Sequence, residues 1–146
     1  MESLASSEVF TPNRPWIHFR AKNETEGLTE IPPYLSGLRI FLLQGSEMRE
    51  LDGVFAQYSR EFEFPAYFGW NWPAFAECLT GLESLPSRGY VTLIHDAEQV
   101  LSDESGELRT FERILNETGR SWANKLGLTH EWGDGPVAFN TIFLTT

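Results

Sequence analysis

The chain has 146 residues, of which 41% are hydrophobic and 14% aromatic, enough for one folded domain without disulfides or metal ions as staples. Its 21 acidic and 11 basic side chains give a net charge of −10, which argues against binding to nucleic-acid phosphates or to an anionic membrane surface. The charge is either a solubility feature or the complement of a basic partner.

The cysteine and histidine content argues against stabilisation by disulfide bonds or metal ions. Cys78 is the single cysteine, and the three histidines lie too far apart for the usual metal-ligand spacings, so we predict no metal site and no cofactor. The N-terminal residues show no basic stretch followed by an apolar run, and no segment approaches the roughly 18 apolar residues of a membrane span. These features predict a reducing compartment, most simply the cytoplasm.

The first part of the chain predicts two strands. Residues 1–15 are polar and interrupted by prolines, and we expect an extended tail there. Residues 16–19 predict a short strand at a sheet edge, and the charged residues 23–33 predict a connection. Residues 38–43 form a compact apolar run that is typical of a buried strand.

The clearest helical pattern follows this second strand. Apolar residues recur there at spacings of three and four, which places them on one helical face: Met48, Leu51, Phe55, Tyr58 and Phe62. We expect Ser46 to cap the start, with Glu47 and Glu50 in the first turn, where the helix dipole favours negative charge. The proline at position 65 is expected to end the helix.

A second helix is predicted from Asn71, a good N-cap residue, to Gly81, with Pro73 tolerated in the first turn. Residues 90–94 predict another buried strand, and residues 96–101 a short helical turn.

The remaining segments complete an alternating pattern. Residues 108–115 predict a third helix, and residues 137–144 predict a last apolar strand. Strands that alternate with helices favour an α/β fold with a mainly parallel sheet. We therefore expect one main domain with about three core strands and three or four helices.

Residues 64–82 are unusually aromatic. Six large rings lie around Gly69: Phe64, Tyr67, Phe68, Trp70, Trp72 and Phe75. Some of them must fill the core, yet so many rings in a loop and one helical turn cannot all point inward. Tyr and Trp are enriched at binding hot spots, and residues 61–87 contain acids but no Lys or Arg. The segment is therefore either core filling or, in part, a binding surface.

The sequence gives little support to a catalytic function. It contains no G-x-S-x-G, P-loop or G-x-G-x-x-G motif, and no histidine lies near Cys78 in sequence. Cys78 falls on the apolar helix face, as a small buried hydrophobe would. The acid-rich residues 95–112 are interpreted as a solvated helix face and loop. A small acidic hydrolase with an aromatic cleft is the enzymatic alternative.

Residues 65–81 resemble the signature of the barstar family. In that family a loop of the form Pro-x-Tyr-Tyr-Gly-x-Asn runs into a helix with an acidic residue followed by Cys-Leu-Thr-Gly. The order of flanking elements also agrees, and the similarity covers residues 38–146, with residues 121–136 as an insertion. Residues 1–36 have no counterpart, so we divide the chain into an N-terminal extension, 1–36, and a barstar-like domain, 37–146.

The resemblance implies both a fold and a function. The fold is a small three-stranded parallel sheet packed with three to four helices, to which residues 16–19 would add an edge strand. The function is inhibition, without enzymatic activity, of a basic secreted microbial ribonuclease in a 1:1 complex. Carboxylates on a loop and the second helix would occupy the place of RNA phosphates, which suits an acidic protein. An immunity protein against an unrelated toxin is the alternative with the same fold.

The resemblance also assigns a partner-binding surface. It consists of one loop, the second helix and one residue of the third: Tyr67, Gly69, Trp70, Asn71, Trp72, Pro73, Ala76, Glu77, Thr80 and Glu117. Glu77 matches the family's central aspartate, which enters the phosphate site. Glu117 is the candidate for a glutamate that the family contributes from the helix before its last strand.

Three positions depart from the family pattern. Pro73 stands where barstar has a second aspartate, and Ala76 and Leu82 stand where it has tryptophans. These changes imply a different target nuclease or contacts supplied by Trp70, Trp72 and Glu83.

Overall fold

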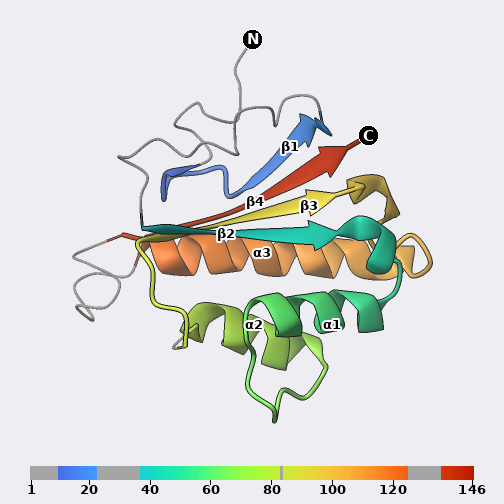
Figure 1. The fold of residues 1–146 in the computed structure, drawn as a ribbon, viewed down its shortest axis with the longest axis horizontal. Coiled ribbons are helices and arrows are strands. Elements are labelled where there is room, and N and C mark those ends of the chain that lie inside the picture. Colours follow the sequence, from blue (N-terminus) through green and yellow to red (C-terminus); the bar gives the residue numbers. More distant parts are fainter. Residues whose placement is uncertain (1–9, 23–36, 83, 125–135) are drawn as a thin grey trace.

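The computed structural model describes residues 10–22, 37–82, 84–124 and 136–146. Figure 1 shows an α/β fold in which the helices lie on one side of a single sheet. The strands and α-helices in chain order are β1 (Ile17–Ala21), β2 (Leu38–Gln44), α1 (Leu51–Glu61), α2 (Trp72–Gly81), β3 (Gly89–His95), α3 (Leu108–Ala123) and β4 (Ala138–Thr145). Short 3-10 turns add η4 (Gly45–Glu47), η5 (Ala97–Gln99) and η6 (Ser105–Glu107). No helix in the described ranges is long and apolar enough to cross a lipid bilayer.

The sheet is parallel, in the order β1-β4-β3-β2, so the predicted α/β fold is confirmed. The expected number of three strands is wrong, because the sheet has four. The fourth is the edge strand predicted at residues 16–19, which pairs with β4 in the register Ile17↔Thr141. Without β1, the edge of β4 would present unpaired N–H and C=O groups.

The start of the segment before β1 packs on the sheet face that lies opposite the helices. Phe10 contacts the apolar side chains of that face: Val91, Leu93, Ile142 and Leu144. The buried Asn140 side chain donates a 2.8 Å hydrogen bond to the Thr11 carbonyl and lies 3.2 Å from the His18 ring nitrogen. The described part of the N-terminal extension is therefore integrated into the sheet.

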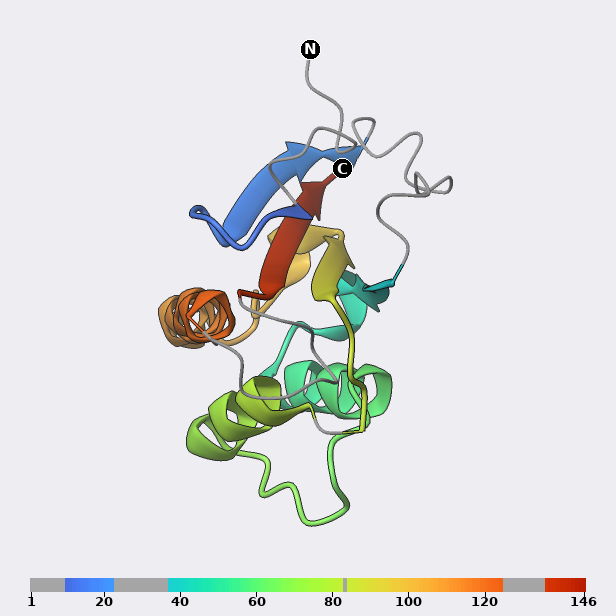
Figure 2. The same cartoon turned by 90° about the vertical axis from the view of Figure 1, so that its left-hand side faces the viewer.

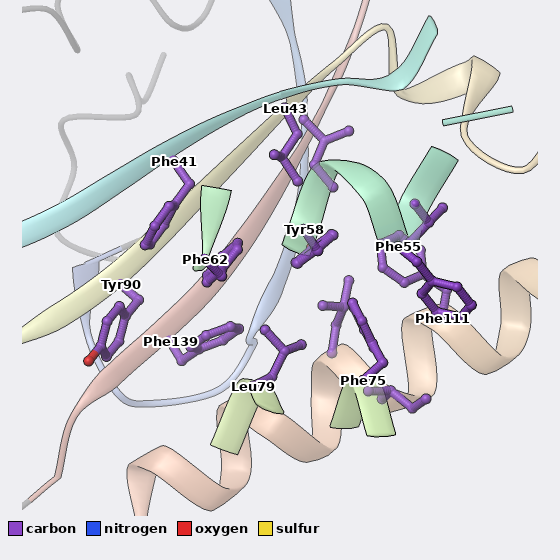
Figure 3. Packing of buried hydrophobic residues seen from close by; sticks show 14 of the residues in the cluster. Phe41, Leu43, Phe55, Tyr58, Phe62, Phe75, Leu79, Tyr90, Phe111 and Phe139 are labelled. Atoms are coloured by element: carbon purple, nitrogen blue, oxygen red, sulfur yellow. The ribbon is translucent and has the colours of Figure 1, made fainter. Parts of the chain in front are cut away.

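The core between the sheet and the helices is rich in aromatic rings. Figure 3 shows rings from β2, β3, α1, α2, α3 and β4 in one cluster. Tyr58 of α1 lies edge-on to Phe75 of α2, with 4.9 Å between ring centroids. Full burial raises the pKa of the Tyr58 phenol, which stays neutral. Phe75 and Leu79 are both completely buried, so the core fixes which side of α2 faces outward.

The start of α1 differs from the prediction. The predicted cap at Ser46 is wrong, because residues 45–47 form a 3-10 turn and the helix begins only at Leu51. The Leu51 N–H donates a 2.9 Å hydrogen bond to the carboxylate of Glu104, which comes from a distant loop. A Cβ on Gly45 would lie 2.3 Å from the Asp96 carbonyl oxygen, so the chain passes tightly against the end of β3 before the helix starts. Tertiary contacts therefore set this boundary.

The ends of the other helices also reflect tertiary structure. Gly81 is the last residue of α2, but the left-handed cap that follows is Leu82, with φ of +43°. The third helix continues to Ala123, beyond the predicted pattern, because the fully buried Trp122 extends its apolar face. Residues 125–135 of the predicted insertion lie outside the described ranges.

Candidate functional site

The loop between α1 and α2 divides its aromatic rings between the core and the surface. Phe68 is buried against Phe64, with 5.0 Å between ring centroids, and its N–H donates to the Pro65 carbonyl. With Phe64 and Phe68 turned inward, Tyr67 is 87% exposed and Trp70 is 48% exposed. The prediction that the aromatic segment is part core and part surface is confirmed.

The backbone of this loop is held in an uncommon conformation. Trp70 has φ of +51°, a left-handed geometry that costs a residue with a side chain about 1–2 kcal/mol. Next to it, the Asn71 side chain donates to the Gly69 carbonyl at 3.1 Å and accepts from the Ala74 N–H at 2.9 Å. Asn71 is thus the predicted N-cap of α2, and it also fixes the loop that displays the Trp70 ring.

The outward face of α2 carries the predicted acid. Glu77 is exposed on the side opposite Phe75 and Leu79, as its spacing predicts. Pro73 is also exposed and Ala76 is half-buried. The Glu77 carboxylate has no hydrogen-bond or ion-pair partner within the described residues.

A hollow of about 590 Å³ lies between this loop and α2. Four predicted site residues line it: Tyr67, Gly69, Glu77 and Thr80. The Thr80 hydroxyl donates to the Glu77 carbonyl at 2.9 Å. Leu82 lines the hollow too, but it is buried and so offers no protruding ring in place of the family's tryptophan.

Cys78 also borders this hollow, half-buried against the core. Burial raises the pKa of its thiol, and the adjacent Glu77 carboxylate raises it further. The thiol is therefore protonated at neutral pH, whereas a catalytic cysteine needs its thiolate form. This environment fits the interpretation of Cys78 as a packing residue.

Trp72 differs from the other predicted surface aromatics. Its half-buried ring lies between Phe55 and Phe111, with centroid separations of 5.1 and 6.0 Å. Its indole N–H donates a 2.8 Å hydrogen bond to the Glu107 carboxylate, which precedes α3. Trp72 therefore joins the start of α2 to the start of α3 and contributes little free surface.

Asp103 and Glu104 are exposed, as the interpretation of residues 95–112 as solvated surface predicts, and Glu107 is half-buried, but all three acids have specific partners. Glu104 caps α1, Glu107 holds Trp72, and Asp103 makes a two-bond ion pair with Arg49 at 2.9 and 3.1 Å. Hydrogen bonding to the Arg49 guanidinium lowers the pKa of the Asp103 carboxyl. This loop folds back over the starts of α1 and α2, where N–H donors are available to carboxylates. Local sequence contains no signal for these distant donors.

Glu117 lies apart from the hollow. It is exposed on α3, and its carboxylate accepts a 3.0 Å hydrogen bond from Arg113 one turn earlier. Glu83, which the sequence suggested as an additional contact, lies outside the described residues. The structure thus groups Tyr67, Gly69 and Glu77 around one hollow and keeps Glu117 separate.

The exposed groups of this surface define what it can bind. A carboxylate accepts hydrogen bonds and carries negative charge, so Glu77 suits a guanidinium, ammonium or imidazolium group. The exposed rings of Tyr67 and Trp70 add apolar contact area. No basic residue occurs in residues 61–87 to compete for Glu77. The surface fits a basic protein partner.

Comparison with known families agrees with the motif. A family model described as Barstar (barnase inhibitor) matches residues 38–131, well over half of the chain. The matched region contains the loop, α2 and the hollow. No curated protein shows significant similarity to the chain. The resemblance read from residues 65–81 is confirmed.

Proposed function

The chain belongs to the barstar family, and on this premise we propose that it inhibits a ribonuclease of the barnase type by covering the nuclease active site with residues 65–71 and α2. Members of this family are inhibitors rather than enzymes. We expect the partner to be a basic secreted nuclease that binds in a 1:1 complex. The observation that carries the proposal is the exposed Glu77 carboxylate, which has no partner within the described residues and lies beside the Tyr67 hollow.

The chemistry of RNA cleavage explains why such a surface would inhibit. A ribonuclease holds the RNA phosphate with cationic side chains, and these groups are equally good donors to a carboxylate. Glu77 would occupy the phosphate position, while Tyr67 and Trp70 would cover the apolar rim and exclude water. The net charge of −10 would speed encounter with a basic enzyme. The protein would therefore block substrate without reacting.

The decisive experiment is inhibition of a barnase-type ribonuclease by the Glu77→Ala variant. Loss of this carboxylate leaves nuclease cations buried and unpaired, which costs about 2–5 kcal/mol. Inhibition should weaken by roughly thirty-fold to several thousand-fold.

The matched control is Glu112→Ala, a helical glutamate on α3 with no hydrogen bond or ion pair among the described residues. It should change inhibition by less than about twofold, because substitutions away from specific contacts have small effects. Circular dichroism must first show that both variants are folded. Equal inhibition by the two variants would overturn the assignment of Glu77. Failure of the unmodified protein to inhibit would favour a different toxin as the partner.

A further inference from the structure

A second hollow, of about 530 Å³, lies where the segment before β1 meets α3. It is lined by Arg14, Pro15, Trp16, Asn116 and Arg120. Figures 1 and 2 place β1 and α2 on opposite sides of α3, so this hollow is remote from the Glu77 surface. Arg14 and Trp16 also precede residue 38, where the family match begins. The hollow thus combines residues before the matched region with Asn116 and Arg120 inside it.

Trp16, which lines this hollow, is held by contacts with three parts of the protein. The indole N–H donates a 2.8 Å hydrogen bond to the Pro12 carbonyl, and the Trp16 carbonyl accepts a 3.0 Å hydrogen bond from the Thr141 N–H of β4. The ring lies against Gly119 of α3, where an added Cβ would come within 2.4 Å of the indole. Only a glycine allows the tryptophan to lie this close to the helix. The indole is therefore fixed by the segment before it, by the sheet and by α3.

The charged side chains that line this hollow are positive. Arg14 and Arg120 both line the hollow, and neither has a carboxylate within ion-pair distance among the described residues. The Arg14 guanidinium carbon lies 5.8 Å from the Trp16 ring centroid, a separation that permits a cation–π contact. Asn116 adds a neutral amide, and no acid among the described residues lines the hollow. Two arginines thus line one hollow in a protein whose net charge is −10.

We propose that this hollow binds the phosphate group of a small ligand, with the phosphate held between Arg14 and Arg120. Guanidinium groups donate in a planar fork that matches phosphate oxygens, and the Asn116 amide can supply a further donor. The overall negative charge would repel a long polyanion, which favours a small phosphate compound over a nucleic-acid strand. Free phosphate and a nucleoside monophosphate both offer this group, and the hollow has room for a ring beside it. The proposal does not rest on inhibition of a nuclease.

The test is a titration of the full chain, at constant ionic strength, with inorganic phosphate and separately with adenosine monophosphate. Binding is followed by ¹⁵N-resolved NMR, which reports on the Trp16 indole and the Asn116 and Arg120 amides. We expect saturable shifts confined to these groups. A lower dissociation constant for the nucleotide would identify a nucleoside phosphate, and equal constants would identify phosphate alone.

Substitutions separate this site from general charge attraction. Arg120→Gln and Arg14→Gln should each raise the dissociation constant by about tenfold or more, since each removes charge-assisted hydrogen bonds. Arg109→Gln, an exposed arginine near the other end of α3, is the matched control and should change it by less than about twofold. Shifts that do not saturate, or equal effects of Arg120→Gln and Arg109→Gln, would overturn the proposal.

Discussion

Replacement of Glu107 by alanine tests how α2 is held to the rest of the protein. The change removes the acceptor of the 2.8 Å hydrogen bond from the Trp72 indole. An unsatisfied buried donor costs about 1–3 kcal/mol, and a hydrogen bond to a charged group contributes a similar amount. Because both residues are only half-buried, water can partly replace the lost acceptor. We therefore expect the free energy of unfolding to fall by about 1 kcal/mol.

A double-mutant cycle isolates this contact. Trp72→Phe keeps a ring between Phe55 and Phe111 but has no N–H to donate. In that background, Glu107→Ala should keep only its cost at the start of α3, so the coupling energy measures the indole contact alone and should be about 1 kcal/mol. Urea unfolding of the four proteins, followed by far-ultraviolet circular dichroism, gives each free energy by linear extrapolation. Unchanged denaturant slopes would show that all four unfold from the same state.

The cycle can also refute the reasoning. Glu107 immediately precedes α3, where a carboxylate interacts favourably with the helix dipole by about 0.3–1 kcal/mol whatever stands at position 72. If Glu107→Ala costs the same in both backgrounds, the dipole explains its effect and the indole contact contributes nothing measurable. A coupling energy below about 0.3 kcal/mol would be that result.

In urea unfolding, the free energy of unfolding of Trp70→Gly should exceed that of Trp70→Ala by about 1 kcal/mol, because glycine tolerates the φ of +51°. Both variants should inhibit more weakly than the unmodified protein. Equal free energies of unfolding would contradict strain in the loop. Deletion of residues 1–14 should lower the free energy of unfolding, since it removes the Thr11 carbonyl that accepts from Asn140, yet leave inhibition intact. A folded truncation that no longer inhibits would show that the binding surface extends further. In stopped-flow measurements, association with a basic nuclease should slow as salt rises, because steering acts over about a Debye length of 8–10 Å. A rate that is independent of salt would remove electrostatics from the mechanism.

The sheet was predictable because each of its core strands has a recognisable local sequence pattern. Parallel strands covered on both faces are nearly continuous apolar runs, and residues 90–94 and 137–144 are such runs and are buried. Residues 38–43 are similarly apolar, although Leu42 of the edge strand β2 is exposed. The cap of α2 was predictable for the same reason, since Asn71 bonds to Ala74 only three residues away. Where the cause of a structure lies within a few residues, the sequence suffices.

The acids of the loop before α3 show why the rest was not predictable. Glu104 and Leu51 are 53 residues apart, and Glu107 and Trp72 are 35 residues apart. Nothing in a polar stretch tells which carboxylate meets a distant donor and which meets water. For the same reason, the sequence could not show that Trp70 is exposed and Trp72 half-buried. Their neighbours in sequence are alike, and only packing against the core decides which ring is exposed. The motif located the candidate surface, and three-dimensional contacts are needed to choose among its residues.

The position of β4 has a consequence for how the protein is made. It is the last of the described strands to be synthesised, yet it lies between β1 and β3 and supplies the neighbour of both. His18 and Asn140, which meet across β1 and β4, are 122 residues apart. Until residues 138–145 leave the ribosome, the nascent chain has one strand without its partner and another with an open edge. Such edges invite aggregation, and pairing over long sequence separations is slow. A chain stalled before residue 138 should therefore be a target for chaperones and proteases, since it would lack an inner strand of its sheet.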